Sequence, residues 1–138
     1  MSQPYLPAAP LVDAILAMVR AGVPATCKVY EGRSVPGAVP PYAVFYFDSG
    51  GKSAFERNVL NEAPRDLRYQ VTAVGSTPEQ ARWVADKVFV PLLTSVPSVS
   101  GRQVWPAIEE GSQPVRPDDE ATGFFLATSQ YLTRSEAT

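Results

Sequence analysis

Fourteen prolines in a chain of 138 residues are the sequence feature that most restricts the fold. Proline fixes its own φ angle and has no backbone N–H, so it interrupts helices and central strands. Several of these prolines fall in three groups, at residues 4–10, 36–41 and 114–117. We therefore predict a chain that is divided into short elements joined by stiff loops.

The length and composition fit one globular domain that spans residues 1–138. Chains of this length usually form a single domain around one core. Hydrophobic residues make up 45% of the chain and charged residues 19%, which separates it from disordered sequences. The net charge of −2 and the pI of about 5.1 argue against broad binding to nucleic-acid phosphates.

Neither a membrane nor an oxidising compartment is indicated. Cys27 is the only cysteine, so the chain cannot form an internal disulfide. Asp13 interrupts the apolar stretch 11–19 and no basic segment precedes it, so we expect no signal peptide. No run reaches the roughly 18 apolar residues of a membrane span. We expect a protein made in a cytoplasm and used there or in a particle assembled there.

The first predicted helix follows an extended arm over residues 1–8. Pro10 suits the first turn of a helix, and the helix is expected to end near Gly22. Its apolar face repeats with helical spacing and consists of Leu11, Ile15, Met18 and Val19.

The second predicted helix has the stronger start signal. Thr77 suits the N-cap, Pro78 the first helical position, and Gln80 can close a capping box. Its buried stripe is predicted to be Ala81, Val84, Ala85, Val88 and Leu92. Pro91 is expected to kink or end the helix, because a proline inside a helix removes a hydrogen bond.

Five strands are predicted, over residues 26–31, 41–48, 66–75, 104–108 and 123–133. The clearest is 66–75, where large apolar and polar residues alternate. Pro106 marks the fourth strand as an edge or a bulge. We therefore predict an α+β fold: a four- or five-stranded, mainly antiparallel sheet with two principal helices packed on it.

The predicted core follows from these periodicities. It consists of Leu11, Ile15, Val29, Val44, Tyr69, Val71, Val84, Val88 and Phe125. Trp105 is expected in the core, whereas Trp83 suits the core and an interface equally well.

Two charged segments are predicted to make contacts with other proteins. Residues 49–65 exceed the length of ordinary loops, about 12 residues, and their charges nearly cancel. The candidate contact residues of this long loop are Lys52, Phe55, Glu56, Arg57, Glu62 and Arg65.

The second segment, residues 109–122, is predicted to be an acidic loop. Its densest cluster is Asp118, Asp119 and Glu120. Such carboxylates can bind a hard cation such as Ca²⁺, although the EF-hand pattern is missing. A solvated loop, a contact with a basic partner and a wall of a lumen are the other interpretations.

No catalytic apparatus is recognisable. The chain has no histidine, and a single cysteine cannot build a zinc site of several thiolates. The stretch 50–53 only superficially echoes a phosphate-binding loop, since the upstream glycine is missing. Without an activating histidine, Cys27 is interpreted as a core residue. We predict no enzymatic activity, no catalytic residue, no metal and no cofactor.

The order of the elements and the residues within them resemble a known family. Val29-Tyr30 is followed by Pro41-Tyr42-Ala43-Val44, then by Arg68-Tyr69-Gln70-Val71-Thr72-Ala73, and directly by the capped helix at Thr77. This order is similar to that of the tail terminator proteins of long-tailed (siphovirus-type) bacteriophages, over about residues 10–95. Ala73 stands where those proteins often have a valine.

The resemblance implies a structural protein of the virion, located at the head–tail interface. Tail terminators form a ring, commonly a hexamer, that ends the growth of the tail tube and offers a docking face to a neck or head-completion protein. DNA passes through the ring without specific binding. On this interpretation residues 1–8 and 49–65 contact neighbouring subunits or the tube, and Asp118, Asp119 and Glu120 face the lumen, where like charge repels DNA.

Three other interpretations are kept open. One is another head–tail connector or tail-completion subunit of the same kind of particle. A second is a small α+β enzyme whose pocket is lined by the aromatic strand 42–47. A third is a cellular binding module that stays monomeric in the presence of tail tubes.

Overall fold

The structure is a computed structural model that describes residues 7–48, 51–52, 65–120 and 122–138. Its elements in chain order are α1 (Ala8–Gly22), β1 (Lys28–Glu31), β2 (Tyr42–Phe47), β3 (Gly51–Lys52), β4 (Arg65–Gly75), α2 (Pro78–Thr94), β5 (Arg102–Val104), β6 (Ile108–Ser112), β7 (Arg116–Pro117) and β8 (Phe125–Ala137). In the part of the chain that is described, no helix is long and apolar enough to cross a membrane.

The strands form one mixed sheet in the order β1-β2-β4-β8-β5. Only the pair β1–β2 is parallel, and every other pair is antiparallel. β3 pairs with β4 beyond the end of β2, and β6 and β7 pair with β8 beyond the end of β5. The predicted α+β class and the mainly antiparallel sheet are confirmed. The short strands β3, β6 and β7 were not predicted.

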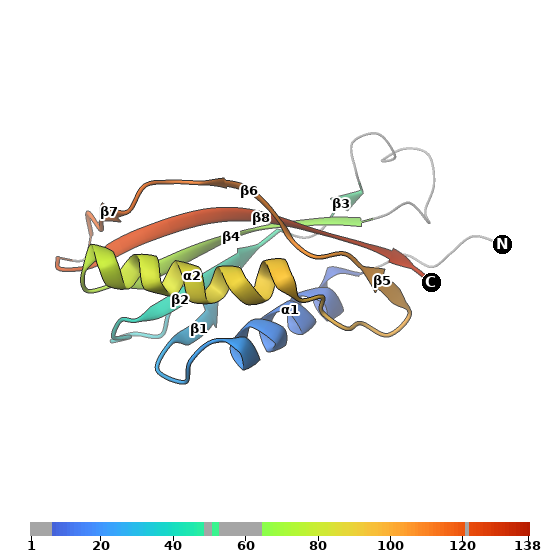
Figure 1. Cartoon of the computed structure of the whole chain (residues 1–138), viewed down its shortest axis with the longest axis horizontal. Coiled ribbons are helices and arrows are strands. Elements are labelled where there is room, and N and C mark those ends of the chain that lie inside the picture. The colour runs from blue at the N-terminus through green and yellow to red at the C-terminus, as the bar shows by residue number, and fades with distance from the viewer. Residues whose placement is uncertain (1–6, 49–50, 53–64, 121) are drawn as a thin grey trace.

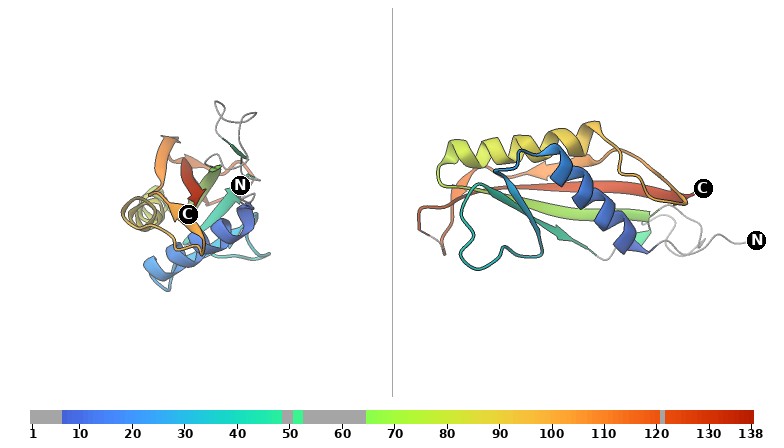
Figure 2. Two further views of the ribbon diagram at one scale, coloured as in Figure 1. Left: turned by 90° about the vertical axis from the view of Figure 1, so that its right-hand side faces the viewer. Right: turned by 90° about the horizontal axis from the view of Figure 1, so that it is seen from below.

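Both helices pack on the same face of the sheet (Figures 1 and 2). Because side chains alternate between the faces of a strand, odd-numbered residues of β2, β4 and β8 point toward the helices. A row of aromatic rings crosses the three strands there, with centroid distances of 5.0 Å from Phe47 to Tyr69 and 5.8 Å from Tyr69 to Tyr131. The Tyr69 hydroxyl lies 2.8 Å from Thr133 Oγ1, so this buried polar group has a partner.

The start of α2 follows the predicted capping with one change. The Thr77 hydroxyl accepts a hydrogen bond from the Gln80 amide at 3.0 Å, as an N-cap does. The Gln80 side chain bonds back to the amide and hydroxyl of Ser76 instead of the Thr77 amide. Gly75 is required just before this turn, because a Cβ atom there would lie 2.3 Å from the Ala81 nitrogen. β4 and α2 are therefore joined as tightly as the backbone allows.

Of the two expectations for Pro91, a kink or an end of the second helix, the end is wrong. Pro91 lies inside α2, which continues to Thr94. Pro91 is buried, and a Cβ atom on Gly22 would lie 3.0 Å from the Pro91 side chain. The close contact between the end of α1 and this turn compensates for the hydrogen bond that the proline removes.

Most of the predicted core is confirmed. Leu11, Ile15, Val29, Tyr69, Val71, Val84 and Val88 are buried between the helices and the sheet, and so is Cys27. Val44 is buried as well, but in a smaller cluster on the other face. Phe125 is only partly buried. Trp83 is partly buried against the core, and the Lys87 ammonium lies 5.8 Å from its ring centre.

The prediction that Trp105 lies in the core is wrong, since 37% of this side chain is exposed. Residues 105–107 are not strand but a link between β5 and β6, which pair with β8 at Val104↔Ser135 and Ile108↔Leu132. Trp105 follows the buried Val104 and its amide donates to the Arg134 carbonyl, so ordinary alternation turns its side chain to the face of the sheet opposite the helices. From Val104 to Ile108, four steps along the link match three along β8, and the extra residue lies after Trp105. Ala107 turns inward instead and donates to the Leu92 carbonyl.

The predicted acidic loop over 109–122 also needs correction. Glu109 and Glu110 belong to β6, and β7 lies within the same range. Since Glu109 pairs with Tyr131 and Arg116 with Leu126, these two residues are roughly 17 Å apart along β8. The acidic residues are therefore divided between two places. The sequence of segment 109–122 predicts a loop, because the side chains of its two short strands are all exposed and show no alternation of apolar and polar residues.

Two further predictions fall largely outside the described residues. Of the predicted arm, Ala8 is already helical in α1, and residues 1–6 are not described. Of the predicted loop over 49–65, the described residues are strand: Gly51 and Lys52 form β3, and Arg65 begins β4.

Candidate functional site

The face of the sheet opposite the helices, called the open face below, carries no helix in the described residues (Figure 2). Even-numbered residues of the long strands point into it, because they alternate with the core residues. They are Tyr42, Val44 and Tyr46 of β2, Arg68, Gln70, Thr72 and Val74 of β4, and Leu126, Thr128, Gln130, Leu132 and Arg134 of β8.

One end of the open face is apolar. Tyr42, Val44 and Val74 are buried there, with Phe124 and Leu126 packed against them. The loop 32–41 returns over this end, and its Ala38 joins the cluster. The rings of Tyr30 and Tyr42 meet edge to face with centroids 5.7 Å apart. A small second core thus holds the loop to the sheet.

A pocket of about 580 Å³ opens beside this cluster. Its floor is formed by the open face, and its lining includes Arg33 and Ser34 of the loop 32–41 and the stretch 116–120. Burial raises the pKa of Tyr42, and the charge of Asp118 acts in the same direction. The pocket therefore combines tyrosines, uncharged polar groups and charges of both signs.

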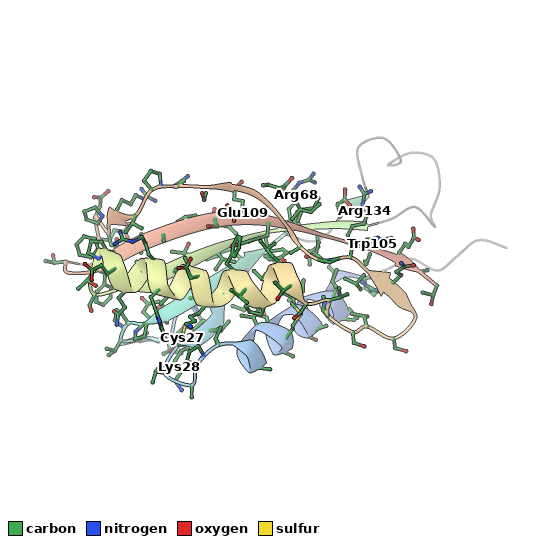
Figure 3. The ribbon with its side chains drawn as sticks, in the orientation of Figure 1. Cys27, Lys28, Arg68, Trp105, Glu109 and Arg134 are labelled. Carbon is green, nitrogen blue, oxygen red and sulfur yellow. The ribbon has the colours of Figure 1, made fainter. Side chains whose placement is uncertain are left out.

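The other end of the open face carries two ion pairs. Arg134 binds the buried carboxylate of Asp66 through two hydrogen bonds of 2.8 and 3.3 Å. Arg68 lies 3.3 Å from Glu110, across from β4 to β6. Figure 3 shows Arg68 and Arg134 over the same part of the sheet. Each of these two arginines is therefore matched by a carboxylate.

The predicted acidic cluster is brought to the pocket. Asp118, Asp119 and Glu120 form the turn after β7 and line its rim together with Arg116. The Asp118 side chain accepts a hydrogen bond from the Glu120 amide at 2.9 Å, and its own amide bonds to the Phe124 carbonyl. Two partners therefore fix the turn.

The predicted contact residues of the long loop are only partly placed. Lys52 of β3 pairs in register with Arg65 of β4, so both stand where the segment 53–64 leaves and rejoins the sheet. Phe55, Glu56, Arg57 and Glu62 lie outside the described residues.

Sequence reasoning missed Arg33, Ser34 and Arg116 as pocket residues. Arg33 and Ser34 reach the pocket only because the loop folds back over β2, and no local pattern indicates that path. The alternation in β4 did contain a signal, since Gln70 and Thr72 mark a face that is not fully buried.

The described residues hold no recognisable catalytic arrangement. Burial raises the pKa of the Cys27 thiol, which makes it a poor nucleophile. Among the described residues, no group of three or more Asp, Glu or Cys side chains is arranged to hold a metal ion. The arrangement on the open face can bind and orient a partner through polar and charged contacts.

Comparison with known proteins identifies the fold. No family model and no curated protein sequence matches the chain. A solved structure entitled "Virion of native gene transfer agent (GTA) particle" contains a chain that is similar to this one with a TM-score of 0.67. The two sequences are 14% identical, and the match covers 97% of this chain and 100% of that chain. The two chains share a fold along their whole length.

Proposed function

We propose that this chain is a structural virion protein that forms a ring, a hexamer, at the head-proximal end of a phage-type tail tube. There it ends polymerisation of the tube protein and joins the tail to a neck or head-completion protein. The observation that carries the proposal is the fold shared with a chain of the gene transfer agent virion over the full length of both chains. The order of elements that resembles tail terminators supports the finer assignment.

The open face supports a role in lining a channel for DNA. Its central residues Gln70, Thr72, Thr128 and Gln130 are uncharged, and its two arginines over the far end are paired with carboxylates. Such a surface offers few free cations to DNA phosphates. In the ring that we propose, Asp118, Asp119 and Glu120 face the lumen and repel passing DNA.

The segment 49–65 is proposed to make the contact with the tube or the next subunit. The ladder of β3 with β4 brings its two ends together, with Gly51 opposite Asp66. A segment closed by such a ladder can be removed without separating β2 from β4. Deletion of residues 53–64 with a short glycine linker should therefore spare folding, as measured by thermal unfolding, and abolish tail completion. Unchanged infectivity would count decisively against the contact role.

A second candidate is another connector or tail-completion subunit, which the shared virion fold supports equally. Negative-stain microscopy of purified protein with tail tubes and with portal-bearing heads separates the two. A terminator caps one end of each tube, whereas a stopper binds the portal side. Bare tubes in the presence of excess protein would contradict the terminator role.

An enzyme remains the least supported candidate. The pocket of about 580 Å³ has the size of a small-molecule site, roughly 300–1,000 Å³. Its lining holds carboxylates, arginines and tyrosines, but the chain has no histidine to act as a general base.

A further inference from the structure

A second groove lies on the helix side, between α2 and the edge formed by β6 and β7. It has a volume of about 530 Å³. Ala127 and Tyr131 of β8 form part of its lining, and α2 contributes Ala85 and the exposed ring of Phe89. Pro114 and Val115 line it from the segment between β6 and β7. The apolar part of the groove is therefore lined by β8, α2 and the segment between β6 and β7.

The groove has an acidic rim. Glu109 and Asp86 stand on opposite walls, and both charges act on Tyr131 between them. Burial first, and then the charge of Glu109, raise the pKa of Tyr131 to about 12, and Asp86 adds to the effect. Within the described residues neither carboxylate belongs to an ion pair, whereas the neighbouring Glu110 is paired with Arg68. Arg82 is the one cation in the lining, so the groove is left with net negative charge.

The opposite edge of the sheet carries a projecting apolar loop. In the segment 32–41, Val39 is 77% exposed and Val35 is 53% exposed. Pro36, Pro40 and Pro41 restrict its backbone, and the Ala38 amide closes a turn onto the Val35 carbonyl at 3.1 Å. The stiff loop loses little conformational entropy when it binds.

The same edge has a small excess of positive charge. Arg33 in the loop and Lys28 at the start of β1 are exposed, against one exposed carboxylate, Glu31, at the end of β1. Figure 3 shows Lys28 and Glu109 on opposite sides of the molecule, as the strand order from β1 to β6 requires. One edge thus presents a projecting apolar loop with two cations and one carboxylate nearby, and the other presents an apolar groove with an acidic rim.

Neither edge is suited to direct pairing of strands between subunits. The guanidinium of Arg20 donates two hydrogen bonds, of 3.0 and 3.3 Å, to the Val29 carbonyl on the outer side of β1. β6 is interrupted by a bulge next to Glu109 and stands between Pro106 and Pro114. Capping groups, bulges and prolines protect sheet edges in this way. Contact between the two edges therefore relies on side chains.

We infer that copies of this chain associate head to tail, with the loop 32–41 of one copy inserted in the α2–β6 groove of the next. Val35 and Val39 contact the apolar lining, and Arg33 lies against the acidic rim formed by Asp86 and Glu109. This contact joins two different surfaces, so repetition generates a ring when the rotation closes. The inference rests on the proposed ring and names the surfaces that build it.

Complementary variants test the contact. Val39→Asp disables the loop and leaves the groove intact, whereas Ser112→Trp fills the groove and leaves the loop intact. Both positions are exposed, so circular dichroism should show native folding. Each variant alone should associate at least about tenfold more weakly than the wild type in sedimentation velocity. An equimolar mixture should give a heterodimer and nothing larger, because only one working loop and one working groove remain.

A matched control is Val96→Asp, which places the same charge at an exposed valine outside both surfaces. It should associate like the wild type. Variants that associate normally, a mixture that gives no heterodimer, or a wild type that is monomeric even at millimolar concentration would each overturn the inference.

Cross-linking gives an independent measurement. In a Cys27→Ala background, the pair Val39→Cys and Ser112→Cys should cross-link between chains into ladders, while Ala17→Cys with Ser112→Cys should not. Ladders of equal yield for both pairs would contradict the inference. Rings on tail tubes without the specific cross-link would overturn these surfaces and leave the proposed function standing. The specific cross-link together with uncapped tubes would support these surfaces and overturn the proposed function.

Discussion

The two faces of the sheet are built from the same strands and have opposite properties. Phe45 is fully buried under the helices, while the next residue, Tyr46, is 43% exposed on the open face. The helix face contains stacked aromatic rings, and the buried hydroxyl of Tyr69 there is hydrogen-bonded with Thr133. The open face contains amides, hydroxyls and paired charges. The difference teaches that most of the core lies on the helix face, while the open face keeps most of its polar groups available to a partner.

The largest expected effect comes from these adjacent residues of β2. Phe45→Ala should lower the free energy of unfolding by about 4 kcal/mol, because it empties a closely packed site. Tyr46→Ala should lower it by less than about 1 kcal/mol. Urea unfolding of both variants measures the contrast. Equal losses would contradict the division of roles between the faces.

A slightly smaller loss in the free energy of unfolding is expected at Gly75, where β4 leads into α2. Gly75→Ala should cost about 3 kcal/mol, since the new methyl group would collide with the backbone of α2. Gly111 offers a matched control, because nothing lies within 4 Å of a Cβ atom there. If both glycine variants unfold at the same urea concentration, close approach of β4 and α2 is not what requires Gly75.

The open face has its own stability element in the buried carboxylate of Asp66. Arg134→Met should cost about 2 kcal/mol, because it leaves that carboxylate without its two charged hydrogen bonds. The double variant Asp66→Asn with Arg134→Met should recover part of the loss. A single variant as stable as the wild type would show that the ion pair between Arg134 and Asp66 contributes nothing to stability.

The last expected effect is a dependence of stability on alkaline pH from the helix-face tyrosines. Burial raises the pKa of Tyr131 to about 12 and that of Tyr69 further, above the ordinary value of 10. The folded state therefore keeps these protons longer than the unfolded state. Their contribution is fully present below pH 10 and is lost as the pH rises toward 12. Urea unfolding of wild type and Tyr131→Phe between pH 9 and 12 measures it. Identical slopes would mean that Tyr131 is not shifted.

The elements with strong local signals were predictable. β4 alternates over most of its length, and α2 begins with a threonine cap and a proline, so both appeared at nearly the observed bounds. β6 and β7 could not be read, because all their side chains are exposed and their pairing with β8 is set by distant residues. Trp105 points away from the helices because it follows the buried Val104, and the extra residue that turns Ala107 inward lies after it, where no local pattern reveals it.

The candidate site was predictable only in part, like the fold. The acidic residues Asp118, Asp119 and Glu120 stand out as a charge cluster, and the structure places them on a pocket rim. The basic loop with Val39 and the groove with Glu109 are separate in sequence from each other and from any recognisable motif. Their complementarity follows only from the strand order, which puts them on opposite edges.

Light scattering of the purified protein with and without tail tubes tests the proposed ring most directly. The account predicts uptake of a fixed multiple of the 14.9 kDa subunit mass at one end of each tube, together with an end to tube growth. A chain that remains a 14.9 kDa monomer in the presence of tubes, while the tubes continue to lengthen, would contradict it.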